Sequence, residues 1–118
     1  MEIEKIINEE GKCIYNIKGR IDTQTAPELQ KAVDESFMAG ENNLVFNFDE
    51  VEYLSSAGLR TILYTQKKIN ALQEETNDQG QNAEQYAGFE IINVKPEIME
   101  VFDMTGFNNM VKITPVPI

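Results

Sequence analysis

The pattern of apolar and polar positions along the chain predicts short strands that alternate with helices. Two runs near the amino end, 1–7 and 13–18, are rich in residues that favour strands, and the first alternates in part between apolar and charged side chains. The five residues between them, Asn8 to Lys12, have the length and composition of a turn. The two runs are therefore expected to form a hairpin.

A helix is predicted after the second strand, which the chain leaves at 19–22. Thr25, followed three residues later by Glu28, matches a capping box, and Pro27 suits a first helical turn. Gly40 is expected to end this helix. The residues at helical spacing that are expected to share its buried face are Ala26, Leu29, Val33, Ser36 and Phe37.

The rest of the chain repeats the alternation of strands and helices. The predicted elements are a buried strand at 44–48, a loop at 49–56, a helix across 59–72, a strand at 89–94, a short helix from Lys95 to a stop at Gly106, and a last strand at 110–113. The stripe of the second helix consists of Leu59, Ile62, Leu63, Gln66 and Ile69, with Leu72 near its end.

The segment 73–86 breaks this pattern, because it carries four acidic side chains, no basic one and only two apolar ones. Such a segment cannot bury enough apolar surface to offset its ordering entropy. It is predicted to be a mobile loop, with extra helix at its start as the alternative. This polar loop is placed at about 73–87.

The predicted order is strand, strand, helix, strand, helix, strand, helix, strand. Alternation of this kind predicts an α/β fold with parallel strands and right-handed crossovers. The opening hairpin adds an antiparallel strand, so a mixed, mostly parallel sheet of about five strands is expected, with helices packed against it. No internal repeat or linker divides residues 1–118, and a single domain is predicted.

Composition excludes several kinds of chemistry. The 118 residues contain no histidine and one cysteine, which excludes a Ser-His-Asp triad, a histidine-containing zinc site and an internal disulfide. The net charge of −10 disfavours nucleic acid as a partner. No run of about 18 apolar residues and no signal-peptide pattern occurs. A cytoplasmic monomer without a metal or cofactor is expected.

The candidate chemistry lies at 55–59, where two serines precede a predicted helix. A hydroxyl at a helix N-cap accepts a hydrogen bond from the first turn, and the helix amino end favours anions. A phosphate on Ser56 would add about −1.5 to −2 charges there. Ala57 and Gly58 would leave the backbone open to a partner. Local spacing alone does not separate a reversible phosphorylation switch from a simple N-cap, which is the commoner role of serine before a helix.

Three stretches, in order along the chain, resemble STAS domains, in particular bacterial anti-sigma-factor antagonists. They are Gly19-Arg20-Ile21-Asp22, Tyr53-Leu54-Ser55-Ser56-Ala57-Gly58-Leu59, and Lys95-Pro96-Glu97 through Val101-Phe102-Asp103-Met104-Thr105-Gly106-Phe107. The resemblance implies a binding protein that is not an enzyme. Such a protein binds an anti-sigma serine kinase and so releases a sigma factor. Phosphorylation of one of its serines by that kinase breaks the complex, and a PP2C-like metal-dependent phosphatase restores it.

The resemblance places the phosphoacceptor at Ser56. Well-known members have an aspartate at the preceding position, where this chain has Ser55, so Ser55 is the alternative acceptor. Relative to the family pattern, the polar loop at about 73–87 is an insertion. The residues that the resemblance assigns to partner binding are Asp22, Ser55, Ser56, Ala57, Gly58 and Leu59. An alternative role is that of a cytoplasmic STAS accessory subunit of a membrane transport system for a lipid or an anion.

Other polar residues have two interpretations each. Asp22 either lies beside the acceptor serine or bonds its own backbone in a turn. Arg60 either pairs with a phosphate on Ser56 or is a solvated helix residue. The three carboxylates Asp49, Glu50 and Glu52 indicate a solvated acidic turn more than a metal site. Cys13 is predicted to be a buried strand residue, and the two methionines Met99 and Met104 either belong to the core or to an exposed contact.

Overall fold

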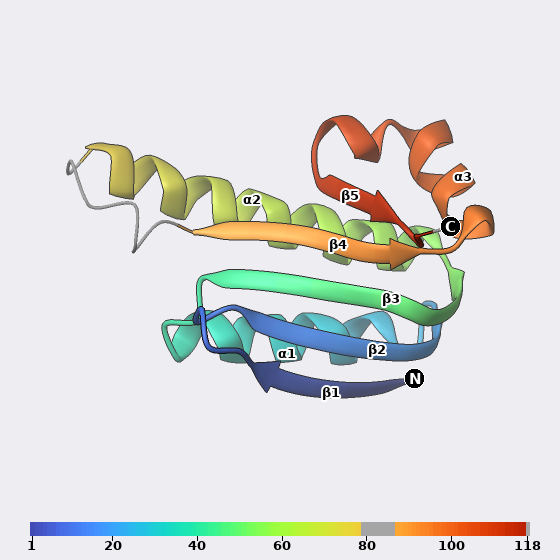
Figure 1. Ribbon diagram of the computed structural model, residues 1–118, viewed down its shortest axis with the longest axis horizontal. Coiled ribbons are helices and arrows are strands. Elements are labelled where there is room, and N and C mark those ends of the chain that lie inside the picture. Colours follow the sequence, from blue (N-terminus) through green and yellow to red (C-terminus); the bar gives the residue numbers. More distant parts are fainter. Residues whose placement is uncertain (79–86, 118) are drawn as a thin grey trace.

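A five-stranded mixed sheet with helices on one face forms the molecule (Figure 1), which we describe from a computed structural model. The structure describes residues 1–78 and 87–117. The elements are β1 (Glu2–Ile7), β2 (Cys13–Ile21), α1 (Ala26–Met38), β3 (Asn43–Leu54), α2 (Ser56–Asp78), β4 (Gly88–Val94), α3 (Pro96–Thr105), the short 3₁₀ helix η2 (Phe107–Asn109) and β5 (Lys112–Pro115). This order of strands and α-helices confirms the predicted fold class.

The strands lie in the sheet in the order in which they occur in the chain. β1 is antiparallel to β2, with Ile3 opposite Ile17, and the remaining pairs are parallel. Because β2 to β5 advance across the sheet in one direction, right-handed crossovers place the intervening helices on the same face. Figure 1 shows α1 and α2 behind the strands, both beginning at the sheet edge where β2 and β3 end.

The core lies between the helices and the face of the sheet that they cover. Phe46 of the central strand is fully buried, with its ring centroid 5.2 Å from that of Tyr15 and 4.8 Å from that of Phe89. Phe48 continues this row towards α3, where its ring lies 6.2 Å from that of Phe102. Aromatic pairs at these separations add to the stabilisation that burial alone provides.

The opposite face of the sheet carries polar side chains that bond to one another across the strands. The Asn47 side-chain amide donates to Asn16 Oδ1 at 2.8 Å, and the Asn93 amide donates to Asn47 Oδ1 at 3.0 Å. Alternation along the strands accounts for both faces, since Tyr15 and Phe46 point to the core and their neighbours Asn16 and Asn47 point away.

Two strands are longer than predicted. The prediction of a loop from Asp49 was wrong, because β3 continues to Leu54, and β2 likewise continues through 19–21. Val51 and Leu54 are buried. Val51 pairs with Gly19 of β2 after one shift of register, and Leu54 pairs with Ile21 after a second. The charged residues among 49–52 conceal this strand in the sequence, since irregular register interrupts the alternation of apolar and polar positions.

Two smaller predictions also need correction. Thr25 makes no side-chain cap to α1; its hydroxyl donates instead to the Arg20 carbonyl oxygen at 2.8 Å and accepts from the Asp22 N–H at 2.9 Å. The expected loop at 73–87 begins later, because α2 runs to Asp78, in line with the alternative of extra helix at its start. The part of the expected insertion at 79–86 lies outside the described residues.

Candidate functional site

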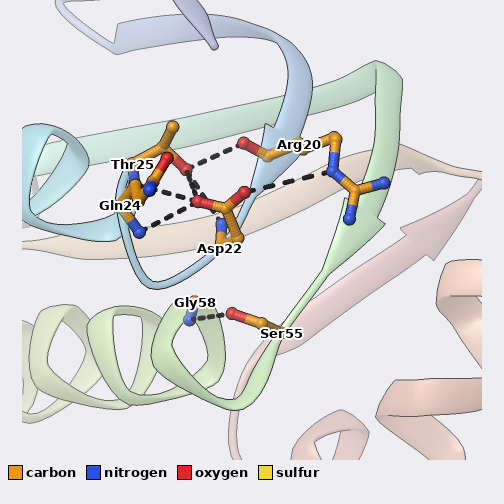
Figure 2. Close-up of polar contacts among 6 residues, drawn as sticks. All are labelled: Arg20, Asp22, Gln24, Thr25, Ser55 and Gly58. Carbon is orange, nitrogen blue, oxygen red and sulfur yellow. Dashed lines mark hydrogen bonds and ion pairs between the residues drawn. The ribbon is translucent and has the colours of Figure 1, made fainter.

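The candidate site lies at the sheet edge where β2 and β3 end. Asp22 follows β2 directly and Ser55 follows β3, and the Ser55 N–H donates to the Ile21 carbonyl oxygen at 2.9 Å. This bond joins the two strand ends, so the turn of Asp22 and the first turn of α2 lie side by side (Figure 2). Binding sites of sheets with parallel strands characteristically lie at this carboxyl edge.

The carboxylate of Asp22 holds its own turn together. Its Oδ1 accepts hydrogen bonds from the backbone N–H groups of Gln24 at 3.0 Å and Thr25 at 3.1 Å (Figure 2). Hydrogen bonding from Thr25, and then from Gln24, holds the pKa of Asp22 below its ordinary value, with a smaller contribution from the charge of Arg20. The turn interpretation of Asp22 is therefore correct, and the turn also places Asp22 at the same edge as the serines.

The lowered pKa predicts that Asp22 contributes to stability mainly near neutral pH. A carboxylate whose pKa is depressed in the folded state stabilises the fold above its unfolded pKa of about 3.9, and this contribution is lost as the pH falls through the folded value. Asp22→Asn keeps an acceptor oxygen but removes the charge. We expect this variant to be less stable than the wild type in urea at pH 7, with a difference that shrinks at about pH 3. Asp49→Asn, at an exposed carboxylate on β3, is the control. If the loss of stability in Asp22→Asn did not depend on pH, this explanation would be contradicted.

The two serines have different roles at the start of α2. Ser55 precedes the helix, and its Oγ accepts a long hydrogen bond of 3.4 Å from the Gly58 N–H, while its carbonyl oxygen accepts from the Leu59 N–H at 3.0 Å. Ser55 is thus the N-cap. Ser56 is the first residue of the helix, its side chain is exposed, and no acidic residue lies in this first turn. The amino end of α2 is therefore open to an anion at Ser56.

Gly58 and Leu59 face the protein's own core, and Ala57 lies between that core and the groove that separates α1 from α2. Ala57 and Gly58 are buried, and Leu59 is half-buried against the core cluster. A Cβ atom added at Gly58 would lie 2.5 Å from Leu54 Cδ1 and 2.8 Å from Ile21 Cγ2. The missing side chain of Gly58 therefore makes room for the ends of β2 and β3, and not for a partner as the sequence interpretation supposed.

Arg20 and Tyr53 complete the exposed edge, and the sequence interpretation did not single out either one. The Arg20 guanidinium lies 4.2 Å from the centroid of the Tyr53 ring, and its Nε lies 3.9 Å from Asp22 Oδ2. Arg20 and Tyr53 are direct partners in the pairing of β2 with β3. This pair can be recognised from the sequence only if 49–54 is known to be a strand. The charged residues in that segment hide the alternating pattern that would indicate a strand.

The remaining candidates do not gather at this edge. Asp49, Glu50 and Glu52 are exposed on β3, not in a turn, and Glu50 pairs with Lys18 at 3.2 Å. Within residues 1–78 and 87–117, no group of three histidine, cysteine or acidic side chains is placed to hold a metal ion. Arg60 is exposed in the second turn of α2.

The structure shows how far Cys13 and the two methionines Met99 and Met104 are buried. Cys13 is buried, which confirms its prediction as a core strand residue. Met99 packs against the core, whereas Met104 is 86% exposed, and its expected role in an exposed contact stays a prediction. No helix in the described part of the chain is long and apolar enough to cross a membrane.

Comparison with known proteins identifies the family. The STAS domain model matches residues 2–76, which is more than half of the chain. The chain is 26% identical over 98 residues to the putative anti-sigma factor antagonist BtrV of Bordetella bronchiseptica, covering 83% of this chain and 73% of that protein. It is 33% identical over 64 residues to the anti-sigma-F factor antagonist RsfB of Mycobacterium tuberculosis, covering 54% of this chain and 52% of that protein, about half the length of each.

The fold agrees with this result. The crystal structure of an anti-sigma factor antagonist from Mycobacterium paratuberculosis superposes with a TM-score of 0.72 at 23% identity, covering 97% of this chain and 86% of that one. In this chain the five-stranded sheet brings the turn after β2 and the start of α2 to one edge. The chain belongs to the STAS domain family.

Proposed function

We propose that this protein is an anti-sigma factor antagonist, which binds an anti-sigma serine kinase and thereby releases a sigma factor. The kinase phosphorylates Ser56, the complex dissociates, and a PP2C-like phosphatase restores the binding form. The protein acts in the cytoplasm as a single STAS domain over residues 1–118. The partner-binding surface is centred on the edge formed by Asp22, Ser55 and Ser56.

The observation that carries this proposal is the exposed side chain of Ser56 at the first position of α2. A kinase needs a hydroxyl that can enter its active site, and Ser56 meets this requirement better than Ser55, which is half-buried and engaged as the N-cap. The phosphate would be received by free N–H groups and by the positive end of the helix dipole. The relatives named as anti-sigma factor antagonists agree with the role.

In this proposal the anti-sigma kinase, and not the STAS domain, catalyses the phosphoryl transfer. A serine nucleophile needs a base within reach, and this sequence has no histidine to supply one. Ser56 is therefore a substrate for phosphoryl transfer from ATP held by the kinase. The STAS domain contributes the accepting oxygen and a surface that changes its charge.

The proposal is tested by purifying the unphosphorylated protein from cells of its source organism and identifying the proteins that copurify with it. We expect an anti-sigma factor with a serine kinase domain, and its purified form should bind this protein directly in isothermal titration calorimetry. Ser56→Ala, which cannot be phosphorylated at this site, should retain the same kinase in the presence of ATP. Retention of a transporter ATPase in place of the kinase would favour the alternative role as an accessory subunit of a transport system.

A further inference from the structure

A groove of about 750 Å³ lies between α1 and α2. The first residue of α2 that lines it is Ala57, which directly follows Ser56. Ala26, Pro27 and Ala57 give it an apolar lining, of which Ala26 and Ala57 are buried. Met38, at the last position of α1, also lines the groove and is 87% exposed. Thr23 and Ala57, which follow Asp22 and Ser56 directly in the sequence, line the groove, so the groove lies beside the candidate site. α1 and α2 begin at that same sheet edge (Figure 1).

Two cations of this acidic protein lie along the groove without an ion pair. Lys31 and Arg60 both line it, and within the described residues neither has a carboxylate oxygen within 4.0 Å. Among the described residues, the cations that do form such pairs are Lys5, Lys12, Lys18 and Arg20, and Lys67, Lys68, Lys95 and Lys112 also lack one. Lys31 and Arg60 differ from those four lysines because they line one groove. The lining also includes the carboxylates of Asp34 and Glu35, so a partner can neutralise an excess of positive charge only at the end of the groove where Lys31 and Arg60 lie.

The acidic residues of the groove lie further along α1. Asp34 accepts a hydrogen bond from the Tyr64 hydroxyl of α2, which engages its carboxylate within the fold. Glu35 lies one helical turn beyond Lys31, in the direction away from the amino ends of both helices. The groove is therefore cationic near Ser56 and anionic towards Met38.

We propose that this groove binds an acidic segment of the anti-sigma kinase, with Arg60 and Lys31 pairing with its carboxylates and the apolar lining receiving a neighbouring aliphatic side chain. This inference rests on the proposed function and names the chemistry of the partner's surface. Binding of an acidic segment in this groove also explains how a single phosphate on Ser56 can dissociate the complex. Arg60 lies four residues after Ser56, about 6 Å along the helix. A phosphate on Ser56 competes for Arg60 and repels the acidic segment.

Charge reversal in the groove tests the inference, with binding to the purified kinase measured by calorimetry at physiological ionic strength. We expect Arg60→Glu and Lys31→Glu each to weaken binding by about tenfold or more. Lys67→Glu is the matched control, since Lys67 is exposed on the same helix but does not line the groove, and it should change the dissociation constant by less than about threefold. Urea unfolding of each variant establishes that the fold is retained.

A carbodiimide cross-link identifies the occupant directly, because it joins an amine to a carboxylate that touches it. We expect an amide between Lys31 Nζ and an aspartate or glutamate of the kinase in the mixed complex, and none at Lys67. Folded Arg60→Glu and Lys31→Glu variants that bind as well as Lys67→Glu, or a complex without a Lys31 cross-link, would overturn the groove assignment while leaving the proposed function in place. A wild-type protein that does not bind the kinase overturns both.

Discussion

Replacing Ser56 by alanine is expected to abolish phosphorylation of this protein by its anti-sigma kinase while leaving the unphosphorylated complex intact. The hydroxyl of Ser56 is exposed at the first position of α2, and alanine keeps the helix because its intrinsic propensity is the highest of all residues. We expect phosphate incorporation from ATP to fall to background in mass mapping. The complex of the variant with the kinase should then persist in ATP, under conditions in which the wild-type complex dissociates.

Ser55→Ala separates the two serines. Ser55 is the N-cap, and its bond to the Gly58 N–H is long at 3.4 Å, so the loss of stability should lie near the lower end of measured cap substitutions, about 0.5 kcal/mol. Phosphorylation of Ser55→Ala should continue at Ser56. If Ser55→Ala lost the phosphate and Ser56→Ala kept it, the assignment of the acceptor would be reversed.

The effect of the phosphate must be local. The protein already carries a net charge of −10, and a further charge of about −1.5 to −2 from a phosphate changes the whole-molecule charge by about a fifth or less. Screening at physiological salt, over about 8 Å, confines its influence to the neighbourhood of Ser56. That neighbourhood holds the Asp22 turn and Arg60, so the proposed switch would act by changing the charges that this edge presents to a partner.

Much of the fold follows from local patterning. The order of elements, the hairpin, the buried strand of Phe46 and the left-handed glycine stops were predictable, because each depends on residues that are close in sequence. The extension of β3 to Leu54 was not, because its stability comes from pairing with β2 across a shifted register and not from its own composition.

Which residues make up the candidate site stays a prediction, whereas their arrangement comes only from the structure. Family resemblance placed Asp22 and Ser56 in it, and the Ser55–Ile21 backbone bond explains why the two strand ends meet. The pairing of Arg20 with Tyr53 and the groove beside Arg60 depend on which side chains the packing of distant elements brings together. Spacing along the chain carries no such information.

Gly58→Val is expected to destabilise the protein strongly, because this position lies against the ends of β2 and β3. A Cβ there would meet Leu54 Cδ1 at 2.5 Å and Ile21 Cγ2 at 2.8 Å, and valine adds two more methyl groups. Overpacking of this kind costs about 1–3 kcal/mol, and we expect about 2–3 kcal/mol here, measured by urea unfolding. Helix propensity acts in the opposite sense, since valine is better than glycine by about 0.4 kcal/mol in a helix. The sign of the change therefore decides between packing and propensity.

A double-mutant cycle with Leu54→Ala locates the clash. Leu54→Ala alone should cost about 2–5 kcal/mol, because Leu54 is 5% exposed and its removal leaves a cavity. In that background the introduced valine gains the space that the Leu54 side chain occupied, so the cost of Gly58→Val should fall by at least about 1 kcal/mol. Additive costs would contradict direct contact. Because Ser56 lies two residues before Gly58, a first turn displaced by Gly58→Val should also slow phosphorylation of Ser56, and Leu54→Ala should restore part of that rate.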